Sequence, residues 1–207
     1  MSDFPDAIKK RRSIRKYKPR PVSPEILLEL IATSSYAPSA HNSQPWRFIV
    51  ITSEPEKRTL AQTMASAWLK DLEKDGASKQ HAEALAKSSV DCFSNTPAIV
   101  LACITMDEMN QYPDERRQKD ERDLALQSLG AAIQTLLLEA HSKGIGSCWC
   151  CAPVFCKDAV RLTLKIPSNV EPQALIRLGY PSEEPSAPKR KPVEDFVFWA
   201  SWGRKIP

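Results

Sequence analysis

Arginines gather near the start of the chain, where Arg11, Arg12 and Arg15 surround a serine at position 13. Guanidinium groups form bidentate, charge-assisted hydrogen bonds to phosphates and carboxylates, and the hydroxyl of Ser13 adds another donor. The cluster could therefore hold an anionic ligand. It could also be the solvated basic end of a helix, where cations favour the helix dipole, and taken alone it slightly favours this second interpretation.

A second basic cluster lies far along the chain, where Lys189, Arg190 and Lys191 stand between two prolines. Taken alone it is a run of solvated charges, and it gains meaning only if the fold returns it to Arg11–Arg15. The sequence contains no G-x-G-x-x-G motif and no G-x-x-x-x-G-K-[ST] motif. A phosphate-bearing ligand would therefore have to be held by side chains.

Two prolines bracket small and amide-bearing residues between Ala37 and Phe48, just before an apolar segment. Such a loop could be a simple capping turn. It could also be a rigid loop that presents backbone and amide groups to a planar, hydrogen-bonding ring. The residues that would do so are Pro38, Ser39, Ala40, Asn42 and Gln44.

The six cysteines include a C-x-x-C motif formed by Cys148 and Cys151. Three interpretations remain open: a redox dithiol, a metal site that also uses Cys156, and cysteines that act as small buried hydrophobes. We favour the last, and we place a metal site last because no second C-x-x-C or well-spaced histidine completes it.

The pattern of apolar residues predicts α and β layers around one sheet, an α+β domain spanning residues 1–207. Ser23 and Pro24 are typical of a helix start, and the helix should end before Pro38. The expected helices are 3–12, 23–36, 56–89 with a break at Gly76, and 121–143 with a cap at Gly144; the expected strands are 47–51, 98–104 and 173–180. Residues 107–119 are expected to form an exposed loop, and residues 181–192 a connector.

Composition excludes several classes of protein. The net charge of +4 is too small to indicate nucleic-acid binding, and no apolar run approaches the roughly 20 residues of a membrane span. The three histidines have no acidic or nucleophilic motif around them, so a hydrolytic triad is unsupported. We expect no signal peptide, and six cysteines without one indicate reduced thiols in a cytoplasmic protein.

The end of the chain is unusually aromatic, with Phe196, Phe198, Trp199 and Trp202 in the last dozen residues. Rings of this size left in water would form an exposed apolar patch. The tail could pack on its own domain or cross a partner subunit. We slightly favour the second, in which residues 180–207 cross the partner subunit, because the aromatic tail follows the loop-like connector 181–192.

Four motifs in this order resemble the nitroreductase family of FMN-dependent oxidoreductases. They are R-R-S-I-R near the start, A-P-S-A-H-N-S-Q-P-W-R-F-I-V in the middle, G-I-G-S-C-W after a long helix, and P-K-R-K near the end. A narrower likeness, carried by Y-P-D-E-R-R, G-I-G-S-C-W and V-F-C-K-D-A-V, is to the nitroreductase-like C-terminal domain of the glutamate ligase for the deazaflavin coenzyme.

The resemblance implies an α+β fold with a central mixed sheet, an intertwined homodimer and FMN at the subunit interface. By residue, it implies that Arg11, Ser13 and Arg15, assisted by Arg12, hold the phosphate, ribityl and pyrimidine parts of FMN. Lys189 and Lys191 would complete the phosphate site. Pro38, Ser39, Ala40, Asn42 and Gln44 would line the flavin ring, coming from the other subunit.

In the family, a backbone N–H after the long helix meets the flavin N5, and the corresponding stretch here is Cys151-Ala152-Pro153. Because proline has no N–H, Ala152 or a neighbour would have to supply that donor. The expected activity is transfer of hydride from NADH or NADPH through the flavin to a small electron-poor acceptor: a nitroaromatic, a quinone or a deazaflavin. The alternatives are a flavin-binding sensor without turnover and a thiol redox protein that uses Cys148 and Cys151.

Overall fold

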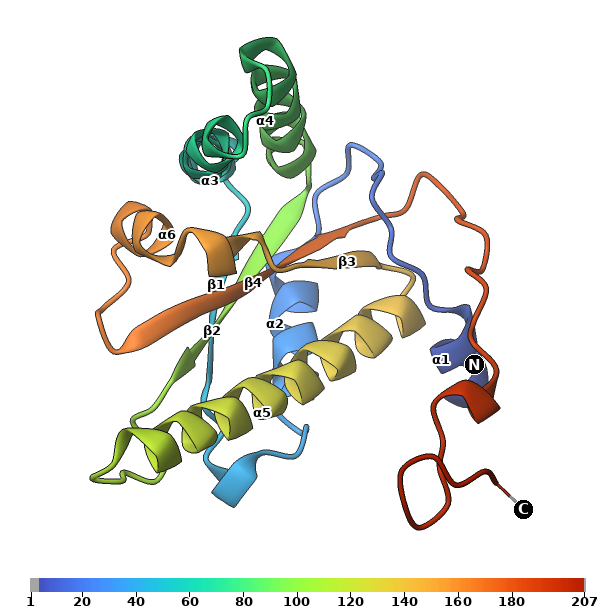
Figure 1. Ribbon diagram of the computed structural model, residues 1–207. Coiled ribbons are helices and arrows are strands. Elements are labelled where there is room, and N and C mark those ends of the chain that lie inside the picture. Colours follow the sequence, from blue (N-terminus) through green and yellow to red (C-terminus); the bar gives the residue numbers. More distant parts are fainter. Residues whose placement is uncertain (1–3, 207) are drawn as a thin grey trace.

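Four strands form one sheet in the order β1-β2-β4-β3, and every neighbouring pair runs antiparallel. The computed structural model describes residues 4–206 (Figure 1). Its elements are α1 Phe4–Lys10, α2 Pro24–Ser34, η1 Ala40–Asn42, β1 Trp46–Ile51, α3 Glu54–Lys74, α4 Lys79–Ser94, β2 Ala98–Thr105, α5 Glu115–Ser142, β3 Gly146–Cys150, η2 Ala152–Phe155, α6 Lys157–Thr163, β4 Val170–Gly179 and η3 Val193–Asp195.

The mixed sheet that we expected is almost wholly antiparallel. Within residues 4–206, its parallel component is a single bridge between Ser13 and Ser147, which adds the N-terminal segment to the outer edge of β3. This bridge matters for the site described below, because it brings the first arginine cluster to the sheet.

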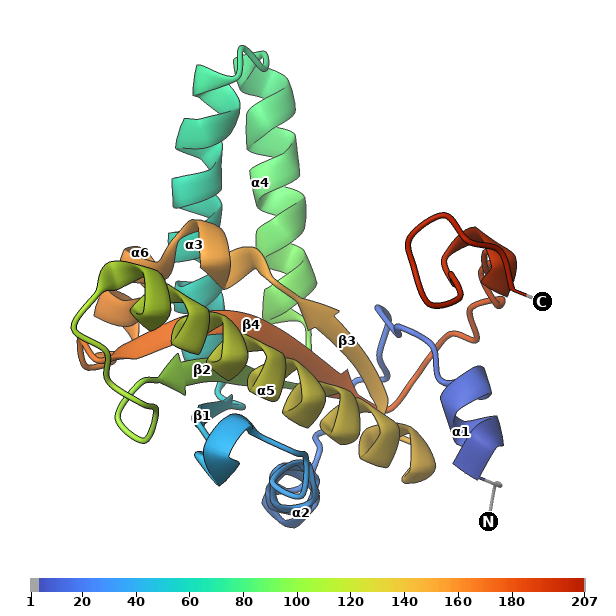
Figure 2. The same cartoon turned by 60° about the horizontal axis from the view of Figure 1, so that its bottom comes forward.

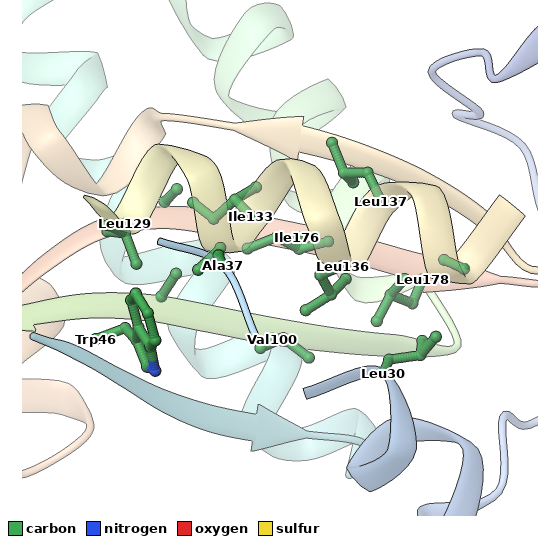
Figure 3. Close-up of a cluster of buried hydrophobic side chains, with 14 of the residues drawn as sticks. Leu30, Ala37, Trp46, Val100, Leu129, Ile133, Leu136, Leu137, Ile176 and Leu178 are labelled. Carbon is green, nitrogen blue, oxygen red and sulfur yellow. The ribbon is translucent and has the colours of Figure 1, made fainter. Parts of the chain in front are cut away.

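Helices cover both faces of the sheet. Residues of α2 and α5 pack on one face, and residues of α3, α4 and α6 pack on the other (Figures 1 and 2). Strand β2 lies in the middle and is buried along its whole length, which confirms the continuously apolar segment 98–104 as a strand buried on both faces. On the α5 side, the buried apolar side chains form one cluster, which includes Trp46 and Leu178 (Figure 3).

Several predicted helix ends are confirmed. Ser23 caps α2 by accepting a hydrogen bond from the backbone N–H of Ile26, with Pro24 at the first helical position. Gly76 and Gly144 have φ of 84° and 70°, in the left-handed region that favours glycine, and they follow α3 and α5 respectively.

Three predictions about the elements were incomplete or wrong. Residues 115–119 are helical rather than loop, because the Asp114 carboxylate accepts from the Arg117 N–H at 2.9 Å and caps α5 earlier. Strand β3 and helix α6 were missed. Strand β3 has five residues, and their apolar alternation is weak because serine and cysteines fill it.

None of the helices in residues 4–206 is long and apolar enough to cross a membrane.

Candidate functional site

The N-terminal arginine segment leaves α1 and runs along β3. The backbone N–H of Ile14 donates to the Ser147 oxygen at 2.9 Å. The contact is so close that a Cβ on Gly146 would lie 2.9 Å from the Ile14 Cβ. Glycine at 146 therefore allows the segment to approach the strand, and β3 sets the position of Ser13 and Arg15.

The C-terminal connector holds the same segment from its other side. Lys18 N donates to the Tyr180 oxygen at 2.8 Å, and Ser182 N donates to the Lys16 oxygen at 3.1 Å. One carboxylate oxygen of Glu183 accepts from the backbone N–H groups of Arg15 and Lys16, at 2.6 and 3.1 Å. These bonds leave the exposed Arg15 side chain on a fixed backbone.

Arg177 anchors the segment from beneath. It lies on β4, is 3% exposed, and donates to the Thr96 hydroxyl and to the Arg15 backbone oxygen, each at 2.9 Å. Its guanidinium also lies over the Tyr17 ring, 5.4 Å from the centroid. A buried guanidinium held in this way is a fixed positive charge under the arginine segment.

The remaining basic residues differ in their exposure and in the groups that they contact. Arg11 is half-buried, and its pKa is lowered by burial and by the nearby cations Arg190 and Arg12. The fold thus returns the second basic cluster to the first, through Arg190. Lys189 and Lys191 are exposed beside it. Arg12 instead donates to the backbone oxygens of Lys9 and Arg11, at 2.6 and 2.8 Å, so its guanidinium caps the end of α1.

The loop between the two prolines is strained and firmly held. His41, Asn42 and Gln44 have φ of 56°, 53° and 46°, in the left-handed region that non-glycine residues avoid. Ala40 N donates to the Ser128 hydroxyl on α5 at 3.1 Å, and Gln44 N donates to the Ser39 hydroxyl at 3.1 Å. Strain that surrounding contacts hold in place is typical of functional sites.

A buried carboxylate supports this loop, and the sequence analysis missed it. Glu121 on α5 is 3% exposed; its Oε1 lies 3.3 Å from His41 Nε2 and accepts from the Asn110 amide at 3.3 Å. Its Oε2 is buried and has no hydrogen-bond partner in residues 4–206. His41 has no acidic neighbour along the sequence, because its carboxylate partner lies 80 residues away and reaches it only in the fold.

In one copy of the chain, the strained loop and the arginine segment lie apart. Element η1 packs under the N-terminal half of α5, whereas α1 lies beyond the C-terminal end of that helix (Figures 1 and 2). Pro38, Asn42 and Gln44 are exposed, and Ser39 and Ala40 are half-buried.

The turn after β3 offers a free backbone donor. Within the described residues, the N–H of Ala152 donates no hydrogen bond to the protein, because η2 begins there. Cys151 before it is exposed, and Pro153 after it is buried and has no N–H. Of Ala152 and Pro153, only Ala152 can therefore supply an N–H to a ligand.

The cysteines do not pair as the C-x-x-C motif predicts. Cys148 lies against Cys150, with 3.8 Å between the two sulfurs, while Cys151 is exposed. Since Cys148 and Cys150 are two residues apart in a strand, they share a face of the sheet. Within residues 4–206, no three His, Cys, Asp or Glu side chains gather as a metal ion would need.

Comparisons with known proteins identify the family of the chain. The model of the nitroreductase family matches residues 8–180. The "Putative NAD(P)H nitroreductase YfhC" of Bacillus subtilis strain 168 is 33% identical, over 92% of this chain and 90% of its own length. An NADH dehydrogenase of Thermus thermophilus is 30% identical, over 95% of this chain and 96% of its own length.

Solved structures extend the agreement to the fold. A BluB-like flavoprotein from Clostridium difficile 630 superposes with a TM-score of 0.81 at 27% identity, covering 97% of this chain and 100% of that one. The chain belongs to the nitroreductase family and is an oxidoreductase of that family.

Proposed function

We propose that this chain is an FMN-dependent enzyme that moves reducing equivalents from NADH or NADPH to a small electron-poor acceptor. The observation that carries the proposal is the arginine segment, held by backbone hydrogen bonds between β3 and the connector. Bound FMN would supply hydride acceptance and donation at its N5 atom. The relatives' names, an NAD(P)H nitroreductase and an NADH dehydrogenase, support the choice of electron donor.

The donors present fit FMN. Arg11 is half-buried, and burial and the cations Arg190 and Arg12 lower its pKa, while the Cys148 sulfur has the opposite effect. Cations gathered in this way suit a phosphate dianion. Ser13 and Arg15 lie next along the segment and suit the ribityl and pyrimidine parts. Lys189 and Lys191 would complete the phosphate site, and Arg12 would assist only from the end of α1.

Positive charge beside the pyrimidine edge would stabilise the reduced, anionic flavin ring. Arg15 is our candidate for this role, because its backbone is fixed by Arg177 and Glu183 while its side chain is exposed. The free N–H of Ala152, next to Cys151, is our candidate donor to N5. The chain would thus bind and orient the flavin without needing a nucleophile of its own.

We further propose that the active unit is a homodimer. The strained loop lies apart from the arginine segment of its own chain, so Pro38, Ser39, Ala40, Asn42 and Gln44 of one copy would line the flavin of the other. The C-terminal tail supports this proposal, because the side chains of Phe196, Trp199 and Trp202 are 60%, 54% and 90% exposed. An exposed apolar patch of this kind is typical of a surface that binds another protein. Residues 180–207 would then cross the second subunit.

A cavity beside Ala152 is our candidate for the acceptor. It has a volume of about 500 Å³ and lies between α3, α4 and η2. Met64, Trp68 and Phe155 give it apolar walls, as small-molecule sites usually have. Its apolar walls, and Ala152 in its lining beside the proposed flavin position, suit a planar acceptor such as a nitroaromatic, a quinone or a deazaflavin.

Steady-state kinetics test the proposal. FMN-loaded protein should oxidise NADH or NADPH and reduce one acceptor class, with the parallel double-reciprocal lines of a ping-pong cycle. Protein that binds FMN stoichiometrically but oxidises neither nucleotide across these acceptors would instead be a flavin-binding sensor.

A further inference from the structure

Two cysteine thiols face each other on β3 at the edge of the arginine segment. Cys148 and Cys150 pair with Arg177 and Leu175 of β4, and Leu175 belongs to the core on the α3 side. The sulfurs are 3.8 Å apart, so the two thiols are already in contact. Cys148 is 4% exposed, while Cys150 is half-buried.

The surroundings of Cys148 favour its thiolate. Its pKa is lowered to about 6 by a hydrogen bond from the Cys150 thiol and by the charges of Arg15, Arg177 and Arg11, although burial opposes the change. The pKa of Cys150 is raised by the same hydrogen bond and by burial. Of the two sulfurs, Cys148 is therefore the one that more readily becomes a thiolate, with the Cys150 thiol as its hydrogen-bond donor.

The other titratable groups near the pair do not reverse this preference. Cys92 on α4 and Tyr17 also lie near the pair. The Tyr17 hydroxyl donates to the Ile14 oxygen at 2.6 Å, and burial raises its pKa, so it stays neutral. Cys103 in the core shows the contrast, because burial raises its pKa to about 12 and no cation offsets it. Cys103 is a small buried hydrophobe, but Cys148 is not.

We propose that Cys148 and Cys150 are a redox-active pair that hydroperoxides oxidise to an intrachain disulfide. The Cys148 thiolate attacks the peroxide, forming an S–O bond while the O–O bond breaks and hydroxide leaves. Cys150 then loses its proton and attacks the Cys148 sulfur; the S–S bond forms, the S–O bond breaks, and water leaves. In total, two thiols and one hydrogen peroxide give one disulfide and two waters.

The resulting disulfide should be easily reversed. Two residues of a strand span about 6.6 Å between Cα atoms, at the upper end of the roughly 4.4–6.8 Å that disulfides accept. Their Cβ atoms lie about as far apart, beyond the roughly 3.5–4.5 Å of a relaxed disulfide, so the backbone at Cys150, the last residue of β3, must bend for the bond to form. A bridge at this limit is more readily reduced than a relaxed one, which is typical of regulatory rather than structural disulfides. Excess dithiol reductant should restore both thiols.

The inference does not depend on FMN, although Arg11 and Arg15 belong to both sites. Full-length protein is treated with equimolar hydrogen peroxide, free thiols are alkylated, and peptides are mapped by mass spectrometry. We expect a Cys148–Cys150 link, a mass about 2 Da below that of the dithiol from loss of two hydrogens, and recovery with dithiothreitol. The matched control is Cys151→Ser, which should leave the link unchanged.

Two isosteric variants complete the test. In Cys150→Ser, dimedone should trap a sulfenic acid at Cys148, because the second thiol is missing; in Cys148→Ser, oxidation at position 150 should fall at least tenfold. A link through Cys151, or oxidation confined to the exposed Cys92 and Cys151, would overturn the proposal.

Discussion

Arg177 donates a hydrogen bond to the backbone oxygen of Arg15 across 162 positions of sequence, at 2.9 Å. This bond ties the arginine segment to the buried C-terminal part of β4. A second bond, to Thr96, fixes the guanidinium at the start of β2. The position of the proposed flavin clamp therefore depends on the core of the sheet as well as on the segment's own residues.

Replacing Arg177 should lower the free energy of unfolding and weaken flavin binding. In Arg177→Met, Thr96 and Arg15 lose buried donors, and we expect a loss of about 2–4 kcal/mol in the free energy of unfolding. Urea denaturation followed by circular dichroism measures it. Arg58→Met removes only an exposed ion pair with Glu54 and should change stability by about 0.5 kcal/mol or less; equal losses in both variants would contradict the anchoring role.

The pair His41–Glu121 should be coupled. His41→Ala removes one of the two side chains that contact the buried Glu121 carboxyl group and leaves only Asn110 there, so we expect a loss of about 1–3 kcal/mol in the free energy of unfolding. Adding Glu121→Leu removes the buried carboxyl group itself and should recover most of the loss. A double-mutant cycle by chemical denaturation measures the coupling, and simple additivity would show that the two side chains act independently.

Glu171 should stabilise the protein in a pH-dependent way. Burial alone would raise its pKa, but hydrogen bonds from Arg122 and Lys157 outweigh this and lower it to about 2. Because the folded-state pKa lies below the unfolded value, the stabilisation is present above roughly pH 4.5 and is lost as pH falls toward about 2.

Glu171→Gln should therefore unfold with a free energy about 1–2 kcal/mol lower than that of the parent at pH 7. This difference in stability should become smaller as the pH falls from about 4.5 toward about 2. Thermal unfolding across this range measures it. Glu29→Gln, which removes an exposed carboxylate paired with Lys143, is the control. A difference independent of pH would rule out the ionic contribution.

The aromatic tail should control association. Removing residues 193–207 takes away the exposed Phe196, Trp199 and Trp202, and we expect the dimer dissociation constant to rise at least about 100-fold, since buried aromatic anchors carry much of an interface's affinity. Sedimentation velocity measures it. Trp68→Ala, an exposed aromatic on α3, should leave association unchanged; a truncated chain that remains dimeric would show that the tail folds on its own domain.

Local patterns predicted much of the fold. The strand at 98–104 and the Ser23-Pro24 start of α2 are predicted correctly. Both depend on residues adjacent in the sequence: a run of apolar side chains for the buried strand, and a capping serine followed by proline for the helix. Strand β3 was missed since its residues are small or thiol-bearing, and it becomes a strand only by pairing with β4.

The missed site features depend on contacts between distant residues. Glu121 reaches His41 only after α5 packs against η1, and Arg177 reaches Arg15 only after β4 pairs within the sheet. The C-x-x-C spacing pointed to Cys151, whereas strand geometry selected Cys150 because alternate residues share a face. A strand prediction for residues 146–150 would have indicated this pairing.

The visible absorbance of the purified protein, with the released cofactor identified, tests FMN binding most directly. We predict a flavin spectrum with one FMN per chain, and a loss of affinity of about 10²–10⁴-fold in Arg11→Ala/Arg15→Ala, because two charge-assisted hydrogen-bonding groups are removed. Arg116→Ala, on the exposed start of α5, is the control. A colourless protein that takes up no added FMN, or a double variant that keeps stoichiometric flavin, would contradict the proposed site.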